Sequence, residues 1–201
     1  MLLPLVAVLV LTGCASGAPV EVSGGADSPY RGTAVSGLPL PDVTLTDAAG
    51  RPFRLRADTR HPVTVVSFGY TNCPDICPTT MADLALARRR LSAAERDRVQ
   101  VVFVTTDPRR DTPRVVGAWL ARFDPSFVGL TGPLPVIEKA AKALGIAVTG
   151  EQRLPGGGYA VGHGTQVLAF GPDHDARVVW SGGTTVADYA HDLRLLANSR
   201  G

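Results

Sequence analysis

Apolar and polar positions along the chain follow two periods, one typical of strands and one typical of helices. Continuous β-branched runs predict strands buried on both faces, and apolar residues at helical spacing predict amphipathic helices. The strand-like runs lie at 62–70, 99–107 and 127–132, and the helix-like segments at 79–91, 111–123, 133–146 and 184–198. Strands that alternate with helices predict a partly parallel sheet with helices on both faces.

Turn and capping residues mark the ends of several elements. Alternating residues on both sides of Gly50 predict an N-terminal β-hairpin over 40–55, and 165–180 predicts a strand, a turn and a strand. Thr112 is expected to cap the helix that follows it, and Gly145 is expected to close another. This order resembles the thioredoxin-like α/β fold: three layers, α/β/α, with a mixed central sheet, an N-terminal β-hairpin and an internal insertion.

The N-terminus carries an export pattern. Residues 1–13 form an apolar run that is too short for a membrane span of about 20 residues but has the length of a signal-peptide core. No Lys or Arg precedes the run, which departs from ordinary signal peptides and leaves the true start codon open. The run ends in "LTGC", which resembles a bacterial lipobox and implies lipidation of Cys14. We therefore expect a lipoprotein signal peptide (1–13), a lipidated cysteine with a flexible tether (14–37) and a folded domain (38–201), held at the extracytoplasmic face of a bacterial cell membrane.

Composition narrows the function. The 201 residues, 45% hydrophobic, suffice for one core, and a net charge of +2 with 6% aromatic residues gives no basic or stacking surface for nucleic acid. The short basic spots at 88–90 and 109–110 are expected on solvated helix faces. We predict no nucleic-acid partner and expect a monomer.

Cys73 and Cys77 are the main candidates for chemistry. They follow a buried strand and precede a helix, the place where α/β sheets form sites. Pro74 and Pro78 disfavour helical backbone at the residue before each, so the helix is predicted to begin near Pro78 or Thr79. Thiols at a helix N-terminus are favoured as thiolates, which are both nucleophiles and metal ligands.

Three uses of this pair stay open. A structural disulfide is compatible with export but would close a very short loop and so restrict the unfolded chain little. A thiol oxidoreductase usually has two residues between its cysteines, whereas three separate Cys73 from Cys77. Two thiolates with an imidazole suit copper, while structural zinc needs four ligands and the chain offers no further cysteine for it.

Of four histidines, His163 is the best candidate for a third ligand. It is predicted in a glycine-flanked loop that leads into a strand, and a thioredoxin-like sheet would put this loop beside the cysteines. His61 precedes a strand, His174 lies in a polar turn, and His191 is expected on the surface of the last helix.

Three blocks together resemble the Sco/SenC family: "FGYTNCPDICPTT", "VVFVTTDPRRDTP" and "YAVGHGTQVLAF". The similarity runs from about residue 38 to 196. It implies a membrane-held copper protein in which Cys73, Cys77 and His163 bind one copper ion, Cu(I) or Cu(II). Asp107 matches a family acidic residue near the site, although an Asp-Pro turn explains it equally well. The family often has Asp and Ser beside its histidine, where this chain has Gly162 and Gly164, so we expect fewer polar partners and a more mobile loop.

The resemblance also implies a role. Family members help to assemble the binuclear copper centre of cytochrome c oxidase subunit II, by delivering copper or by reducing the cysteines of that subunit. Further expected partners are other copper carriers and thiol reductants. A copper carrier needs His163 as well as both cysteines, whereas a general thiol–disulfide oxidoreductase, the alternative, needs only the cysteines. A peroxidase is disfavoured: "ICPTT" resembles the peroxiredoxin "VCPTE", but neither cysteine has that family's upstream threonine and proline. The sequence thus favours a metallochaperone over an enzyme.

Overall fold

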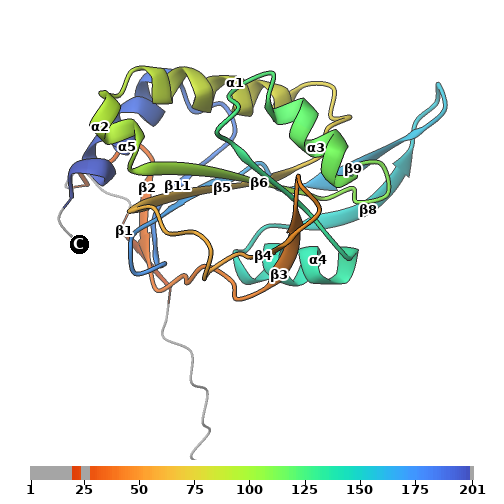
Figure 1. Cartoon of the computed structure of the whole chain (residues 1–201), viewed down its shortest axis with the longest axis horizontal. Coiled ribbons are helices and arrows are strands. Elements are labelled where there is room, and N and C mark those ends of the chain that lie inside the picture. The colour runs from red at the N-terminus through yellow and green to blue at the C-terminus, as the bar shows by residue number, and fades with distance from the viewer. Residues whose placement is uncertain (1–19, 24–27, 200–201) are drawn as a thin grey trace, which may run out of the picture.

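The computed structural model describes residues 20–23 and 28–199, and within them one large sheet runs through the molecule (Figure 1). Its order is β1-β2-β11-β10-β5-β6-β7-β3-β4, and β8 and β9 form a separate two-stranded sheet. The strands are β1 (Glu21–Ser23), β2 (Thr33–Ser36), β3 (Thr44–Asp47), β4 (Pro52–Arg54), β5 (Val63–Gly69), β6 (Val99–Thr105), β7 (Val128–Thr131), β8 (Val148–Arg153), β9 (Tyr159–His163), β10 (Val167–Phe170) and β11 (Ala176–Trp180).

The centre of the large sheet is parallel and its flanks are antiparallel. Strands β5, β6 and β7 run parallel, and the pairs β3–β4 and β10–β11 are antiparallel, as predicted for the two hairpins. Gly69 at the end of β5 is in register with Thr105 at the end of β6. The loops that leave these two strands therefore begin side by side, and one of them carries Cys73 and leads into the helix that carries Cys77.

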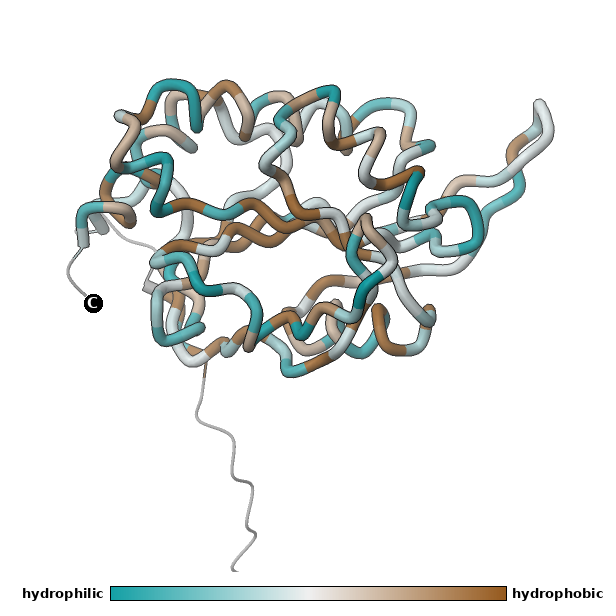
Figure 2. The backbone as a smooth tube through the Cα atoms, viewed as in Figure 1, coloured by the Kyte–Doolittle hydropathy of each residue, from teal (hydrophilic) through white to brown (hydrophobic). Residues whose placement is uncertain are grey.

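Helices cover both faces of the sheet, which confirms the three-layer arrangement (Figure 1). They are α1 (Ile76–Arg89), α2 (Ala93–Arg96), α3 (Pro113–Leu120), α4 (Leu134–Ala143) and α5 (Val186–Asn198). Side chains alternate along the central strands, so that Val65 and Phe103 pack toward α1 and α5 while Val66 and Val104 pack toward α4. Hydrophobic segments accordingly concentrate along the central strands (Figure 2). No helix among the described residues is long and apolar enough to span a membrane.

Helix ends follow the sequence closely, with one correction. The Thr112 side chain accepts a hydrogen bond from the Val115 amide, and Gly145 closes α4 with a φ of 68°. Helix α1, however, begins at Ile76 rather than near Pro78. Pro78 is the third residue of the helix, where the backbone N–H has no intrahelical partner, so proline is tolerated there. Cys77 consequently lies inside the first helical turn.

The expected boundary between tether and domain is also corrected. Strand β2, inside the segment expected to be a tether, pairs with β11 in the large sheet. The buried carboxylate of Asp192 accepts hydrogen bonds from the backbone amides of Arg31 and Gly32, at 2.8 and 2.9 Å. The folded domain therefore includes residues 28–37. Cys14 and the signal-peptide segment lie outside the described residues.

Candidate metal site

The structure brings Cys73, Cys77 and His163 together. Their Sγ and ring-nitrogen atoms all lie within 4.8 Å of one another, and the Cys77 Sγ is 3.2 Å from the His163 Nε2. The Cys77 amide donates a hydrogen bond to the Cys73 Sγ at 3.4 Å, and both thiols are free. One cysteine comes from the β5–α1 loop, one from the first turn of α1, and the histidine from the end of β9. Three separate segments thus supply two sulfur donors and one nitrogen donor.

The imidazole of His163 is oriented by a backbone carbonyl. Its Nδ1 lies 2.8 Å from the Gly164 carbonyl oxygen. Because a carbonyl oxygen only accepts hydrogen bonds, Nδ1 carries the proton and Nε2 presents its lone pair to the thiols. The second ring nitrogen of a metal-binding histidine is usually fixed in this way.

His163 does not lie in the mobile loop expected from its glycine neighbours. It is the last residue of β9, and Gly162 beside it pairs with Thr149 of β8. A Cβ at position 162 would come within 2.0 Å of the Thr149 Oγ1. The glycine therefore fits a close cross-strand contact, and the histidine is held at the end of a regular strand.

Gly69 has no side chain, and this leaves room for the Cys77 sulfur against strand β5. A Cβ at this position would lie 2.8 Å from the Cys77 Sγ and 2.9 Å from the Phe103 Cε2. The sulfur therefore packs directly against the β5 backbone. Cys77 is 3% exposed and Cys73 is 9% exposed, so Cys73 forms the accessible edge of the pair.

The pKa values of the two thiols are shifted in opposite directions, down for Cys73 and up for Cys77. A hydrogen bond from the Cys77 thiol lowers the pKa of Cys73, and the backbone amides of Asp75 and Cys77 lower it further. The same hydrogen bond, together with burial, raises the pKa of Cys77. Both shifts favour loss of the first proton at Cys73, and a bound soft metal would displace the remaining proton from Cys77.

Asp107 lies near this site but outside its donor cluster. Its carboxylate is 3% exposed, forms an ion pair with Arg110 and accepts a hydrogen bond from the Tyr159 hydroxyl at 3.0 Å. Among the described residues, the cluster that could hold a metal ion contains Cys73, Cys77 and His163 only. Asp107 therefore acts on neighbouring side chains rather than as a ligand.

Asp111 is a site-forming residue that the sequence analysis did not single out. It is 0% exposed and accepts hydrogen bonds from the Thr71 amide at 2.9 Å and from the Thr71 and Thr105 hydroxyls at 2.5 Å each. It therefore ties the cysteine loop to the β6–α3 loop. The only signal was an acidic residue directly before the Thr112 cap, which local patterns do not distinguish from a surface aspartate.

The other histidines lie elsewhere, as expected. His61 is exposed, and His174 adopts a φ of 61° in the β10–β11 turn. The side chain of His191 is 39% exposed, and its Nδ1 donates to Asp192 at 2.9 Å. None of the three joins a metal-ligating cluster in the described part of the chain.

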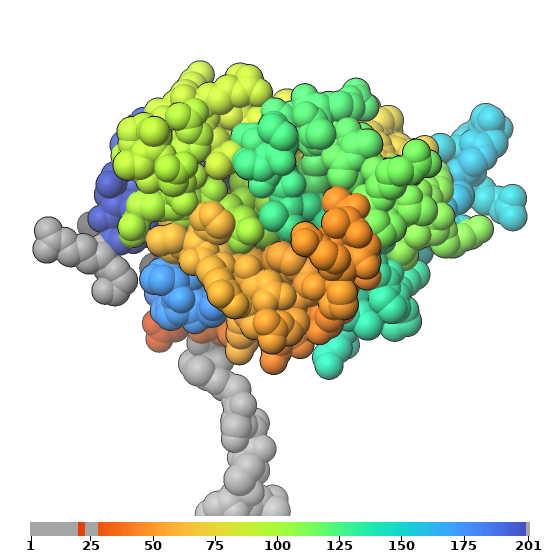
Figure 3. Space-filling view, viewed as in Figure 1, coloured from red at the N-terminus to blue at the C-terminus, as the bar shows by residue number. Residues whose placement is uncertain are grey.

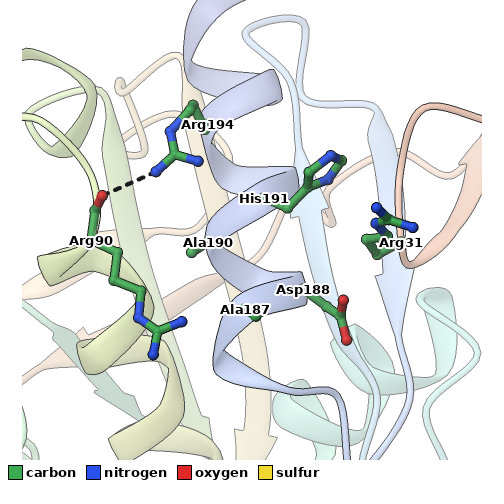
Figure 4. Close-up of a pocket in the computed structure, with 7 residues that line it drawn as sticks. All are labelled: Arg31, Arg90, Ala187, Asp188, Ala190, His191 and Arg194. Carbon is green, nitrogen blue, oxygen red and sulfur yellow. Dashed lines mark hydrogen bonds between the residues drawn. The ribbon is translucent and has the colours of Figure 1, made fainter.

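A hollow of about 390 Å³ lies along α5, away from the metal-site cluster (Figure 4). It is lined by Arg31, Arg90, Ala187, Asp188, Ala190, His191 and Arg194. Arg194 donates a hydrogen bond to the Arg90 carbonyl oxygen at 3.1 Å.

The basic spot at 88–90, expected on a solvated helix face, is only partly solvated. Arg88 is 7% exposed, and its guanidinium pairs with the Asp124 carboxylate at 2.6 Å. Arg88 is thus a buried ion-pair residue, whereas Arg90 lines the hollow.

Comparisons of the sequence with known proteins point to one family. The family model described as SCO1/SenC matches residues 40–198. A Stutzerimonas stutzeri protein named for copper binding is 33% identical over 138 residues, which cover 69% of this chain and 67% of that protein. The mitochondrial SCO2 homolog of Mus musculus is 32% identical over 133 residues, 66% of this chain and 52% of the relative. The chain thus spans about half the length of that mitochondrial relative.

The fold of this chain is also similar to that of a solved structure. Yeast Sco1 with copper bound is 27% identical, with a TM-score of 0.71 over 79% of this chain and 87% of the yeast chain. The family match covers the two cysteines, the histidine and all strands from β3 to β11. The chain belongs to the SCO1/SenC family.

Proposed function

We propose that this protein binds one copper ion through Cys73, Cys77 and His163 and passes it to a partner protein. The observation that carries the proposal is the cluster itself: two sulfur atoms and a correctly oriented imidazole nitrogen within 4.8 Å. Thiolate and imidazole donors together favour copper over hard cations. Copper in the yeast Sco1 structure and in the name of the Stutzerimonas relative supports this choice.

The donor set fits a transferable ion better than a structural one. A structural zinc site is closed by four protein ligands, whereas this cluster has three. The accessible edge at Cys73 gives a partner's thiolates a route to the metal. Copper is cargo in this scheme and leaves by ligand exchange, without a change in the protein's covalent structure.

The proposed recipient is the binuclear copper centre of cytochrome c oxidase subunit II, at the extracytoplasmic face of a bacterial membrane. The Sco/SenC blocks of the sequence support this target. A lipid on Cys14 would hold the domain near the membrane and raise its effective concentration at the oxidase without any new contact. The chain would act as a monomer.

Copper titration tests the proposal. The reduced chain lacking residues 1–14 would be titrated anaerobically against a Cu(I) chelator, with a Cu(II) titration in parallel. We expect one ion per chain, with binding strongly weakened in Cys73→Ser, Cys77→Ser and His163→Ala. His191→Ala, a half-exposed histidine outside the cluster, is the matched control and should bind as the wild type does. Wild-type affinity in all three cluster variants would overturn the proposal.

The second candidate function is disulfide reduction. The free, adjacent thiols and the lowered pKa of Cys73 favour it. Cys73 would attack a target disulfide, Cys77 would resolve the mixed disulfide, and two electrons and two protons would pass to the target as a Cys73–Cys77 disulfide formed. A reductase does not need His163, so retained reduction of a peptide disulfide by His163→Ala, with copper binding lost, would favour this role.

A further inference from the structure

The hairpin that carries His163 has little support from the rest of the sheet. Strands β8 and β9 pair only with each other among the described strands, and the hairpin projects from one side of the domain (Figures 1 and 3). From Thr149 to Arg153 every residue of β8 is exposed. Backbone pairing alone therefore does not fix the imidazole against the thiols.

Arg110, in the β6–α3 loop, contacts Tyr159 at the start of β9. The Arg110 guanidinium lies 3.7 Å from the centre of the Tyr159 ring, and its Nη1 donates to the Tyr159 carbonyl oxygen at 3.0 Å. Its Nε donates to Asp107, which also accepts the Tyr159 hydroxyl at 3.0 Å. Asp107, Arg110 and Tyr159 thus form a closed ring of contacts, which we call the hairpin clamp. Tyr159 lies four residues before His163.

Arg110 of the clamp also lies near Tyr70, which precedes the cysteine loop and contacts His163. The Arg110 guanidinium lies 5.7 Å from the Tyr70 ring, and this ring meets the His163 ring edge-on at 5.8 Å. The Tyr70 carbonyl oxygen accepts the Cys73 amide at 3.1 Å. Arg110 therefore sits where a small shift changes the distance between imidazole and thiols.

We propose that Arg110 is a positioning residue for the copper site: through the hairpin clamp it keeps the His163 Nε2 directed at Cys73 and Cys77. This inference rests on the proposed copper function. A planar guanidinium is required because it stacks on a ring and donates to two different oxygens at once, whereas a lysine ammonium is a point charge. Without Arg110 the hairpin keeps its own pairing and the buried Val161, but the imidazole is no longer fixed against the thiols and copper binding weakens.

Arg109 supplies a matched control. It is the preceding residue and also bridges to the hairpin, through Glu151 at 2.5 Å. The two side chains of that pair are 72% and 43% exposed, so solvent screens the interaction. Arg109 also lies 5.7 Å from the centre of the Tyr159 ring, but it donates no hydrogen bond to Tyr159 or Asp107. Its loss therefore removes a charge and two weak hairpin contacts and leaves the hydrogen bonds among Asp107, Arg110 and Tyr159 in place.

A double-mutant cycle on copper affinity tests the proposal. We expect Arg110→Ala to weaken binding by about 10–100-fold, as for outer partners of metal-binding histidines. Arg110→Lys should not restore it, and Arg109→Ala should stay within about twofold of the wild type. If Arg110 acts only through His163, then Arg110→Ala combined with His163→Ala binds copper as His163→Ala does. Additive losses in the double variant, or wild-type affinity in Arg110→Ala, would overturn the proposal.

A metal-free measurement separates this inference from the proposed function. In the reduced apo protein, amide hydrogen exchange in β9 should be faster in Arg110→Ala than in the wild type, with exchange in β5 and α1 unchanged. Unchanged exchange in β9, or equal acceleration throughout, would show that Arg110 does not hold the hairpin. If copper binding by the wild type did not depend on His163, the copper function would fail while this exchange result still decided the role of the clamp.

Discussion

Replacing Asp111 by alanine should both destabilise the domain and open the cysteine loop. The carboxylate is fully buried and accepts three hydrogen bonds, two from Thr71 and one from Thr105. Hydrogen bonds to a charged group contribute about 1.5–3 kcal/mol each, but these three share one acceptor and water can reach the half-exposed Thr71. We therefore expect the free energy of unfolding to fall by about 3–5 kcal/mol, less than the sum of three full bonds.

Urea unfolding of the reduced, metal-free protein measures this loss. Asp111→Asn keeps the shape and one acceptor oxygen, so its loss should be smaller, about 1–2 kcal/mol. Asp47, the half-buried last residue of β3, is the matched control, because its carboxylate also accepts three hydrogen bonds, from the exposed residues Ala49 and Arg51 of the turn that follows. Asp47→Ala should cost about 1 kcal/mol.

Alkylation of Cys77 reports on the loop itself. This thiol is 3% exposed in the native domain, so it should react slowly with iodoacetamide. When Asp111 no longer holds Thr71, the loop before Cys73 loosens and Cys77 should react faster, even under conditions where the domain stays folded. A change in unfolding free energy below about 1 kcal/mol for Asp111→Ala would refute the buried-network reasoning. A large change with unaltered alkylation would refute the link to the cysteine loop.

Three further outcomes are expected. Gly69→Ala places a Cβ 2.8 Å from the Cys77 Sγ, so it should cost about 1–3 kcal/mol in urea unfolding and weaken copper binding, whereas Gly150→Ala, which meets nothing within 4 Å, should do neither. The hydrogen bond from Cys77 lowers the pKa of Cys73 to about 3. The stability that this thiolate contributes is therefore fully present above the ordinary thiol pKa, decreases as pH falls below it and is gone once pH has fallen through the folded value. Iodoacetamide should therefore label Cys73 at about pH 6, and a rate falling tenfold per pH unit below about 8.5 would contradict this. Free copper at about 100 times its dissociation constant should raise the free energy of unfolding by about 2.7 kcal/mol, reversibly with chelator, and an equal rise in His163→Ala would count against the site.

Local signals were enough to predict the elements that build the site. Thr112 caps α3 because a hydroxyl before a proline-led helix start satisfies a free amide, a relation contained within four residues. Cys73 and Cys77 were identified as a site because a strand, a proline-rich turn and a helix follow one another directly. His163 was singled out by its place before a strand, although the strand that ends at it was not predicted. The polar segment "VTGEQR" of β8 has no apolar alternation, because a ribbon outside the main sheet buries little.

Local sequence patterns could not predict the hydrogen bonds that join residues far apart in the chain. Thr71 and Asp111 are separated by 40 residues, Arg110 and Tyr159 by 49, and Arg31 and Asp192 by 161. Each partner alone is an ordinary polar residue with no periodic signal. The last of these pairs also explains why the domain starts earlier than predicted: the segment 28–37 is short and glycine-containing, and it is ordered by a carboxylate at the other end of the chain.

The geometry of the site depends on a loop that contributes no ligand. Within the β6–α3 loop, Asp111 holds the cysteine segment and the adjacent Arg110 holds the histidine hairpin. The distance between thiols and imidazole is therefore set by two neighbouring residues on one loop, whose start is fixed by the parallel register of β5 and β6. This arrangement offsets the absence of polar side chains at Gly162 and Gly164, because a backbone carbonyl orients the ring and the hairpin clamp positions its strand. We therefore expect copper affinity in this chain to depend on the side chains of the loop, whereas the residues flanking the histidine contribute through their backbone.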